Sequence, residues 1–236
     1  MKIIIPTCDK FRNLLEANKY TVDKFGGANL DVTILGYKEP DFDLGAWNFV
    51  SLGIDTGAKN FSNNIKPFFD EFNEEYFIYG NDDGLLVNWF NHGFLNEIIE
   101  TIKQIPNFGR MWLTRTPASY YGGGVVIKVF NEYNISEINQ FAEYRLSLQC
   151  SIWKTSYFKK YLVPNLSPWE WETRGTAKYD NAAILLPVNN SVVSLGHIMK
   201  RGQLLKNWHQ SIYHEAELSI DDIRIIEEIF KKHGIM

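Results

Sequence analysis

The feature that most constrains this sequence is its first apolar run, Ile3-Ile4-Ile5, which Pro6 ends. Successive side chains of a strand point to opposite faces of a sheet, so three β-branched residues in a row cannot all face one side. The run therefore predicts a strand buried on both faces, as in a parallel sheet covered by helices on each side. A chain of 236 residues is long enough to bury such a sheet in one domain.

Strands and helices are expected to alternate along the first half of the chain. Asp9 is a candidate N-cap for a helix that ends at Gly26-Gly27, and Ser62 is a candidate N-cap for a second helix with an apolar stripe. Strands are expected over residues 31–37, 49–52 and 76–79, and a third helix runs through residues 94–102. This alternation favours an α/β fold with a mixed, mostly parallel central sheet flanked by helices.

The second half of the chain has a more mixed pattern. A helix begins at Ser167-Pro168, and a C-terminal helix begins at Ser219, with Asp222 in the capping-box position. Asn189-Asn190 is typical of a turn between two short strands. The other predicted elements are strands over 110–116, 125–130, 146–152, 183–188 and 192–195, and a helix over 154–162.

Charge and composition exclude several classes of protein. The net charge is −4 and there is no basic run, so neither nucleic acid nor an acidic membrane surface is an expected partner. Cys8 and Cys150 form no metal-ligand cluster and are expected to be buried free thiols of a reducing compartment. No stretch reaches the roughly 18 apolar residues of a membrane span, and the first run is too short for a signal peptide. The expected location is the cytoplasm.

An acidic turn, Asn81-Asp82-Asp83-Gly84, follows the aromatic strand Tyr76-Phe77-Ile78-Tyr79 directly. The carboxyl end of a strand is where open α/β sheets bind ligands. A hard divalent cation takes one or two carboxylates together with phosphate oxygens. Asp83 is therefore a candidate metal ligand, and Asn81 or Asp82 a candidate contact to a nucleotide sugar. The alternative is an ordinary solvated Asp-Asp-Gly turn.

The segment Ser167-Pro168-Trp169-Glu170-Trp171-Glu172 places two tryptophans and two glutamates on one helix. The two glutamates point to different sides, so one carboxylate is expected to face inward beside aromatic walls. Desolvation by such walls raises the pKa of a carboxyl group toward the range of a general base. The alternative is an amphipathic helix with two core tryptophans and two solvated glutamates.

Three polar residues in the last third of the chain are further candidates for the site. His197 follows a short strand and is a candidate metal or phosphate ligand, although a hydrogen-bonded structural histidine is the alternative. Lys200 and Arg201 are candidates for neutralising a diphosphate leaving group, or else belong to a solvated turn. The glycines 122–124 lack the spacing of a phosphate loop and indicate a bend or an acceptor-side loop. No hydrolase or peptidase motif is present.

Taken in order, these motifs resemble a known family. The chain carries Thr7-Cys8-Asp9-Lys10 after the first strand, then FSNNIKPFF, YFIYGNDDGLL, LSLQCSIWKTSYFKKYL and SPWEWE, and finally the glycines Gly196 and Gly202. This series over residues 2–205 resembles the GT-A-type glycosyltransferases of bacterial and phage surface-polysaccharide clusters. The acidic element is Asn-Asp-Asp and departs from a strict Asp-x-Asp pattern.

The resemblance implies a GT-A fold, a nucleotide-diphospho-sugar donor, a glycan acceptor and Mn²⁺ or Mg²⁺. It implies a nucleotide-binding half (1–105), an acceptor-side half (106–205) and a C-terminal helical extension (206–236) of a single domain. Asp82 and Asp83 would occupy the metal-binding position, and Glu172, or secondarily Glu170, would be the base of an inverting enzyme. By the resemblance, Thr7 and Asp9 would lie near the nucleotide. The full set of residues expected to contact substrate or nucleotide is Thr7, Asp9, Asn81, Asp82, Trp153, Trp169, Lys200 and Arg201.

Two alternatives stay open at the level of sequence. The Asn81 departure is compatible with a non-catalytic module that binds carbohydrate or nucleotide on the same fold. A nucleotidyltransferase would also use paired carboxylates and a metal, but the N-terminus lacks a Gly-rich basic phosphate loop. Inversion or retention, and the oligomeric state, are likewise open.

Overall fold

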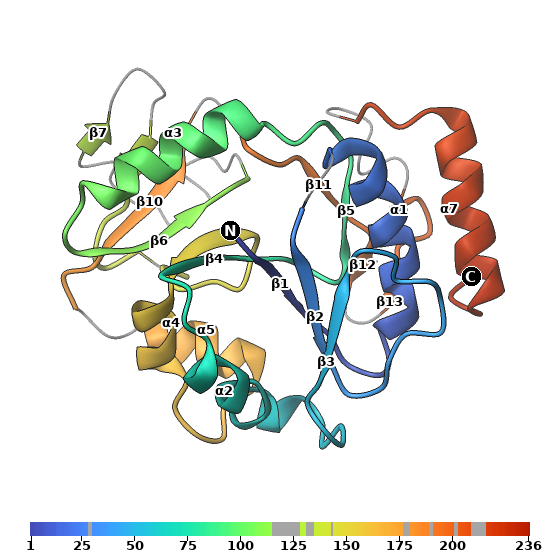
Figure 1. The fold of residues 1–236 in the computed structure, drawn as a ribbon, viewed down its shortest axis with the longest axis horizontal. Coiled ribbons are helices and arrows are strands. Elements are labelled where there is room, and N and C mark those ends of the chain that lie inside the picture. Colours follow the sequence, from blue (N-terminus) through green and yellow to red (C-terminus); the bar gives the residue numbers. More distant parts are fainter. Residues whose placement is uncertain are drawn as a thin grey trace.

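The centre of the protein is a nine-stranded sheet with the strand order β3-β2-β1-β4-β9-β6-β10-β8-β7 (Figure 1). The fold is taken from a computed structural model, which describes residues 1–27, 30–114, 128–130, 135–142, 144–176, 180–188, 191–200, 203–208 and 216–236. The strands of this sheet are β1 (Ile3–Pro6), β2 (Val32–Gly36), β3 (Asn48–Ser51), β4 (Tyr76–Tyr79), β6 (Phe108–Trp112), β7 (Lys128–Phe130), β8 (Ile135–Glu137), β9 (Ser151–Lys154) and β10 (Ala183–Pro187).

Strand direction divides the sheet into two parts. Strands β3, β2, β1 and β4 are mutually parallel, as the continuous apolar run at residues 3–5 predicts. Strand β9 then runs antiparallel between β4 and β6, and β10 is parallel to β6. Strands β8 and β7 complete the sheet in antiparallel pairings. The predicted mixed, mostly parallel sheet is confirmed.

Helices cover both faces of this sheet. Ile3 and Ile5 pack in one core with α1 (Leu15–Phe25) and α3 (His92–Lys103), whereas Ile4 packs in another with α2 (Phe61–Glu71), α4 (Thr155–Tyr161) and α5 (Pro168–Thr176). This separation follows from the alternation of side chains along a strand. Ile4 is fully buried, so its truncation to alanine would destabilise the fold by about 2–5 kcal/mol.

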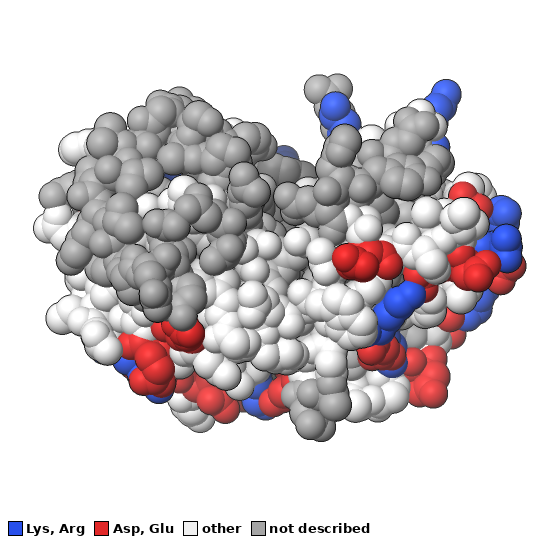
Figure 2. All heavy atoms as spheres, turned by 90° about the horizontal axis from the view of Figure 1, so that it is seen from above, with Lys and Arg blue, Asp and Glu red and all other residues white. Residues whose placement is uncertain are grey.

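A further helix, α7 (Ile220–Lys232), lies outside α1 at one end of the molecule (Figure 1). Its Ile226 and Phe230 share a third apolar cluster with Leu14 and Ala17. Ser219 and Asp222 form the predicted capping box, and Asp222 also pairs with Lys24 of α1. Figure 2 shows acidic and basic side chains interspersed at this end, which is the pattern of a solvated surface.

Two small antiparallel ribbons complete the described structure. Strand β5 (Gly84–Leu86) pairs with β11 (Leu195–His197), and β12 (Met199–Lys200) pairs with β13 (Gln203–Leu204). The sequence did not indicate β5, and it predicted the strand at 192–195 rather than at Leu195–His197. A three-residue strand carries too little periodicity to be read from sequence, and its partner is more than 100 residues away along the chain.

The two predicted N-caps in the first half of the chain are wrong. A 3₁₀ turn, Arg12–Leu14, leads into α1, so Asp9 lies before the helix. Another 3₁₀ turn, Ala58–Asn60, leads into α2, and Ser62 is buried inside that helix. The Ser62 hydroxyl instead accepts a hydrogen bond from the backbone N–H of Leu166 at 2.9 Å, a partner that local sequence cannot reveal.

Among the described residues, no helix is long and apolar enough to cross a membrane. Both cysteines are free thiols; Cys150 is buried, as predicted, whereas Cys8 is partly exposed, contrary to the prediction. The glycine-rich segment 122–124 and the turn Asn189-Asn190 lie outside the described residues. The division of the chain into halves of different function stays a prediction.

Candidate active site

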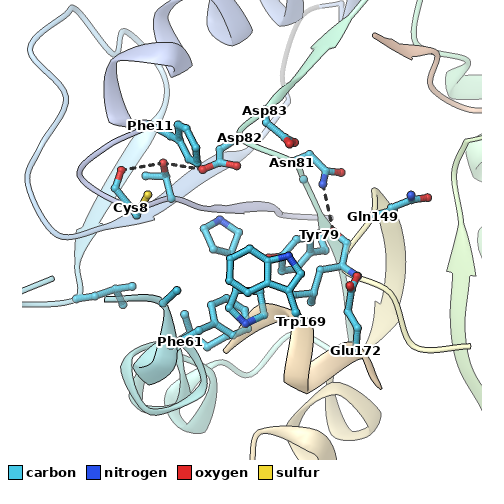
Figure 3. Close-up of a pocket in the computed structure, with 18 of the residues that line it drawn as sticks. Cys8, Phe11, Phe61, Tyr79, Asn81, Asp82, Asp83, Gln149, Trp169 and Glu172 are labelled. Carbon is cyan, nitrogen blue, oxygen red and sulfur yellow. Dashed lines mark hydrogen bonds between the residues drawn. The ribbon is translucent and has the colours of Figure 1, made fainter. Parts of the chain in front are cut away.

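A pocket of about 560 Å³ opens at the carboxyl ends of the parallel strands (Figure 3). Its walls come from the segments that follow β1, β2, β3 and β4, from the residues that precede antiparallel β9, and from α5. The lining residues are Pro6, Thr7, Cys8, Phe11, Tyr37, Leu52, Asp55, Gly57, Ala58, Phe61, Ile65, Tyr79, Gly80, Asn81, Asp82, Asp83, Leu148, Gln149, Pro168, Trp169, Glu172 and His197. The strand directions explain this assembly, because parallel strands end at one edge and an antiparallel strand begins there.

The acidic turn forms one wall of the pocket. Gly80 lets β4 approach β1 closely, since a Cβ atom at this position would lie 2.8 Å from Ile5 Cγ1. The Thr7 hydroxyl donates a hydrogen bond to Asp82 Oδ2 at 2.9 Å. Beneath the turn, the buried Asn18 amide donates to the carbonyls of Asn81 (3.0 Å) and Gly84 (2.6 Å). The turn is therefore held from the first strand and from α1.

The β5–β11 ribbon brings His197 to the same wall. His197 is opposite Gly84 in the antiparallel register, and the N–H of Ile198 donates to the Asp83 carbonyl at 3.2 Å. The His197 side chain is exposed and lines the pocket. A residue from the last third of the chain is thus placed beside the acidic turn by pairing between two very short strands.

Negative charge dominates the electrostatics of the pocket. Burial, and then repulsion from the neighbouring Asp83 carboxylate, raise the pKa of Asp82 to about 7. Burial, together with the charges of Asp82, Glu172 and Asp83, raises the pKa of Tyr79 well above its usual value. Tyr79 therefore lies within the field of carboxylates from both walls of the pocket.

Helix α5 forms the facing wall, so that in Figure 3 Trp169 and Glu172 lie across the pocket from Asp82 and Asp83. The side chain of Trp169 is 67% exposed, which leaves a wide apolar face available at the pocket. Glu172 points to the segment before β9, where its Oε1 accepts a hydrogen bond from the Leu148 N–H at 2.6 Å. Burial raises the pKa of Glu172, against hydrogen bonds to Leu148 and Ser147 that lower it.

The structure separates the two glutamates of α5. Glu170 accepts hydrogen bonds from the N–H and hydroxyl of Ser167 and pairs with Arg174, so it caps and braces the helix outside the pocket. The Glu170–Arg174 pairing is spaced i, i+4 and is exposed, so it contributes little to stability. Of the two candidate bases, Glu172 is the one that lines the pocket.

Most of the nominated residues come together in this one pocket. Those that line it are Thr7, Asn81, Asp82, Asp83, Trp169, Glu172 and His197. Asp9 lies behind the wall, where it pairs with Lys38 and its N–H donates to the pocket residue Asp55 at 3.2 Å. Lys200 is exposed on β12 and does not line the pocket, and Arg201 lies outside the described residues.

Trp153 does not lie at the pocket, contrary to the interpretation of the sequence. It is fully buried on β9, where its ring packs edge-on against Trp171, with centroids 5.5 Å apart. The alternation along β9 explains this placement, because Trp153 shares the sheet face covered by α4 and α5. Trp153 is a core residue.

The sequence interpretation missed several pocket residues. They are Phe11, Tyr37, Asp55, Phe61, Tyr79 and Gln149. One signal was present for Tyr37, which directly follows β2 just as Thr7 directly follows β1. Gln149 had no such signal, because its place depends on β9 running antiparallel beside β4, with Ser151 opposite Tyr79.

The donor atoms at the acidic turn fit a hard divalent cation that is shared with a phosphate group. Within the described part of the chain, the buried Asn81 Oδ1 has no hydrogen-bond partner, and it accompanies the carboxylates of Asp82 and Asp83. Mg²⁺ and Mn²⁺ favour such oxygen donors. No group of three His, Cys, Asp or Glu side chains in the described ranges is arranged to hold a metal ion alone. The phosphate would have to complete the ligand set.

The sheet order, the covering helices and the pocket at the strand ends define the GT-A class of fold. Structures of this class have the same architecture as this chain. The mannosyltransferase PcManGT from Pyrobaculum calidifontis, in complex with GDP-Man and Mn²⁺, matches with a TM-score of 0.52 and 15% identity over 85% of this chain. TarS 1-349 from S. aureus matches with a TM-score of 0.51 and 15% identity over 81% of this chain.

A third structure, TarS 1-349 in complex with UDP, matches with a TM-score of 0.50 and 14% identity over 100% of this chain and 72% of that chain. The matches to PcManGT and to TarS 1-349 cover only 57% and 59% of those chains. No family model matches the sequence. No curated protein matches it either. At this level of identity the comparisons confirm the predicted GT-A fold.

Proposed function

We propose that this protein is a glycosyltransferase that moves a sugar from a nucleotide-diphospho-sugar to a glycan acceptor. The observation that carries the proposal is that a paired-carboxylate turn and a half-buried glutamate, Glu172, face each other across one pocket of a GT-A fold. Such an arrangement supplies a place for the diphosphate on one side and a base for the acceptor on the other. The resemblance in sequence points to the same function.

The donor side of the pocket is assigned to the segments after β1 to β4. Phe11, Tyr37 and Phe61 give it aromatic surface of the kind that packs against a flat nucleobase or a ribose. The acidic turn lines the same pocket, where Asp82 accepts a hydrogen bond from Thr7. A nucleotide bound along the aromatic residues would direct its diphosphate toward Asp82 and Asp83.

The charge of the pocket indicates that the diphosphate binds together with a divalent cation. The described lining residues include the carboxylates of Asp55, Asp82, Asp83 and Glu172, but no lysine or arginine. A diphosphate beside these carboxylates would be repelled unless a cation were present. Asp83, Asp82 and Asn81 Oδ1 would hold Mn²⁺ or Mg²⁺, which would offset the charge on the departing diphosphate. PcManGT, which shares the fold, was solved with Mn²⁺.

Glu172 is proposed as the general base. Its carboxylate would take the proton of the acceptor hydroxyl while the acceptor oxygen forms a bond to the anomeric carbon of the sugar. The bond between that carbon and the diphosphate oxygen breaks, and the nucleoside diphosphate leaves with the bonding electrons. Attack from the side opposite the diphosphate inverts the anomeric configuration. The exposed face of Trp169 offers a stacking surface for an acceptor sugar ring.

Isothermal titration with a panel of nucleotide sugars, with and without Mn²⁺, tests the donor side of this proposal. Binding of at least one donor that strengthens with Mn²⁺ is expected, together with transfer to an acceptor or slow hydrolysis of the donor. A folded protein that binds none of the donors would refute the proposal. Donor binding without either reaction would instead favour a non-catalytic binding module.

A further inference from the structure

Arg110 of β6 is fully buried. Its guanidinium carbon lies 3.5 Å from the centroid of the Trp112 ring and 4.9 Å from that of Trp153. Burying a charged group is costly unless hydrogen bonds and nearby π-systems compensate. The burial of this guanidinium therefore depends on the groups to which it donates hydrogen bonds.

Arg110 donates hydrogen bonds to the first residue of β9 and to the backbone just before it. Its Nε and one terminal nitrogen donate to Ser151 Oγ at 3.0 and 2.7 Å, and the same terminal nitrogen donates to the Gln149 carbonyl at 3.4 Å. The other terminal nitrogen donates to the Arg145 carbonyl at 3.4 Å. Ser151 Oγ in turn donates to the Gln149 carbonyl at 2.7 Å. The planar fork of Arg110 thus ties both ends of segment 145–149.

The middle of this segment touches both walls of the pocket. The N–H of Leu148 donates to Glu172 Oε1 at 2.6 Å, and the carbonyl of Leu148 accepts a hydrogen bond from Asn81 Nδ2 at 3.3 Å. One residue therefore joins the helix that carries the proposed base to the acidic turn. Movement of segment 145–149 would disturb Glu172 and Asn81 together.

We propose that Arg110 is a positioning residue, which holds segment 145–149 so that Leu148 orients Glu172 for proton abstraction. The proposal rests on the glycosyltransferase function assigned above. Arg110 itself does not line the pocket, so its effect must pass through the backbone of this segment.

The electrostatics of Glu172 agree with this arrangement. The positive charge of Arg110 lowers the pKa of Glu172, in opposition to the burial that raises it. Tyr79 of β4 is another ionisable group near Glu172, and its pKa is raised in part by the Glu172 charge. Removal of the Arg110 charge should therefore move the titration of Glu172 to higher pH.

The test compares Arg110→Met, which removes charge and donors, with Arg110→Lys, which keeps the charge but lacks the fork. Arg110→Met is expected to lower kcat by roughly 10- to 100-fold, as a small misplacement of a catalytic group does, while the donor KM changes by less than about threefold. Arg110→Lys should recover part of the loss. Ile226→Ala is the control for a general loss of stability, because Ile226 is equally buried but lies in the separate apolar cluster of α7.

A second readout does not depend on turnover. In protein labelled with ¹³C at glutamate carboxyl carbons, the resonance that disappears in Glu172→Gln belongs to Glu172. Its pKa should rise in Arg110→Met, rise less in Arg110→Lys, and stay unchanged in Ile226→Ala. If Arg110→Met does not fold, Ser151→Ala should lower kcat by a smaller factor with little change in the pKa of Glu172, because it removes two of the hydrogen-bond contacts of Arg110 and keeps its charge.

The proposal is overturned if the Glu172 titration or kcat is unchanged in Arg110→Met, if the loss falls on donor affinity, or if Ile226→Ala produces equal losses. If the wild-type protein transfers no sugar at all, the proposed function fails. The ¹³C titration would still show whether Arg110 governs the state of Glu172. The two failures are therefore distinguishable.

Discussion

Replacement of Glu172 by glutamine removes one negative charge from the pocket and leaves the shape of the side chain almost unchanged. The amide oxygen can still accept the hydrogen bond from the Leu148 N–H, so segment 145–149 should keep its place. A general base contributes roughly 10²- to 10⁴-fold to rate. At about 1.36 kcal/mol per tenfold change, the variant should lose about 3–5 kcal/mol of transition-state stabilisation. Donor affinity should change little, because Glu172 lies on the wall across from the acidic turn.

The same substitution should lower activity but favour the folded state at higher pH. The pKa of Glu172 is raised in the folded protein above its ordinary value of 4.5, mainly by burial. Between the ordinary pKa and the folded pKa, the folded state binds more protons than the unfolded state. The wild-type protein therefore loses stability as the pH rises through this window, whereas the variant has no such group. The free energy of unfolding of Glu172→Gln, relative to wild type, should shift in favour of the variant as the pH rises.

Both effects can be measured on one preparation. Initial rates of transfer at saturating donor give kcat, and urea denaturation at a series of pH values gives the two free energies of unfolding. Glu170→Gln separates the two glutamates of α5, because a glutamine at that position keeps the cap on Ser167 but lies outside the pocket. Full turnover in Glu172→Gln would refute the base assignment. A stability difference that does not vary with pH would refute the account of burial.

Three further predictions concern the acidic turn, the acceptor surface and the outer helix. Asp83→Ala should weaken donor binding in the presence of Mn²⁺ by about tenfold or more, which is about 1.4 kcal/mol per tenfold, and should abolish the Mn²⁺ dependence measured by isothermal titration. An unchanged Mn²⁺ dependence would exclude Asp83 as a metal ligand. Trp169→Ala should raise the acceptor KM, while its free energy of unfolding should stay within about 0.5 kcal/mol of the wild-type value, because the side chain is 67% exposed. An unchanged acceptor KM would show that Trp169 is not part of the acceptor site. Ser219→Ala should lower the free energy of unfolding by about 0.5–2 kcal/mol and leave kcat unaltered, and circular dichroism should show a lower thermal midpoint. No loss of stability would mean that the capping box does not anchor α7.

Features that depend on local pattern could be predicted from the sequence. The apolar run at residues 3–5, the turn after Tyr79 and the capping box at Ser219 were located correctly, because strand burial, turn chemistry and helix capping involve residues close in the chain. The acidic turn was expected at the carboxyl end of a buried strand, and β4 does end there. The resemblance added the GT-A fold, which the structural comparisons confirm.

Features that depend on long-range pairing could not be predicted. Local pattern left Glu170 and Glu172 equivalent, and only the packing of α5 against the segment before β9 directs Glu172 into the pocket. Trp153 is carried into the core by the register of β9, and His197 reaches the acidic turn only through the pairing of β11 with β5. No pattern in the sequence indicated that the buried Arg110 binds the backbone of segment 145–149.

The sequence by itself determined that the chain forms a buried parallel sheet with an acidic turn at the end of β4. It did so because the periodicity of apolar residues and the chemistry of turns are local. Only the tertiary structure decided which carboxylates meet across the pocket, since strand order and register join residues far apart in the chain. The acidic turn was visible in the sequence and the resemblance favoured Glu172 over Glu170, but only the fold shows that Glu172 lies across the pocket from the turn.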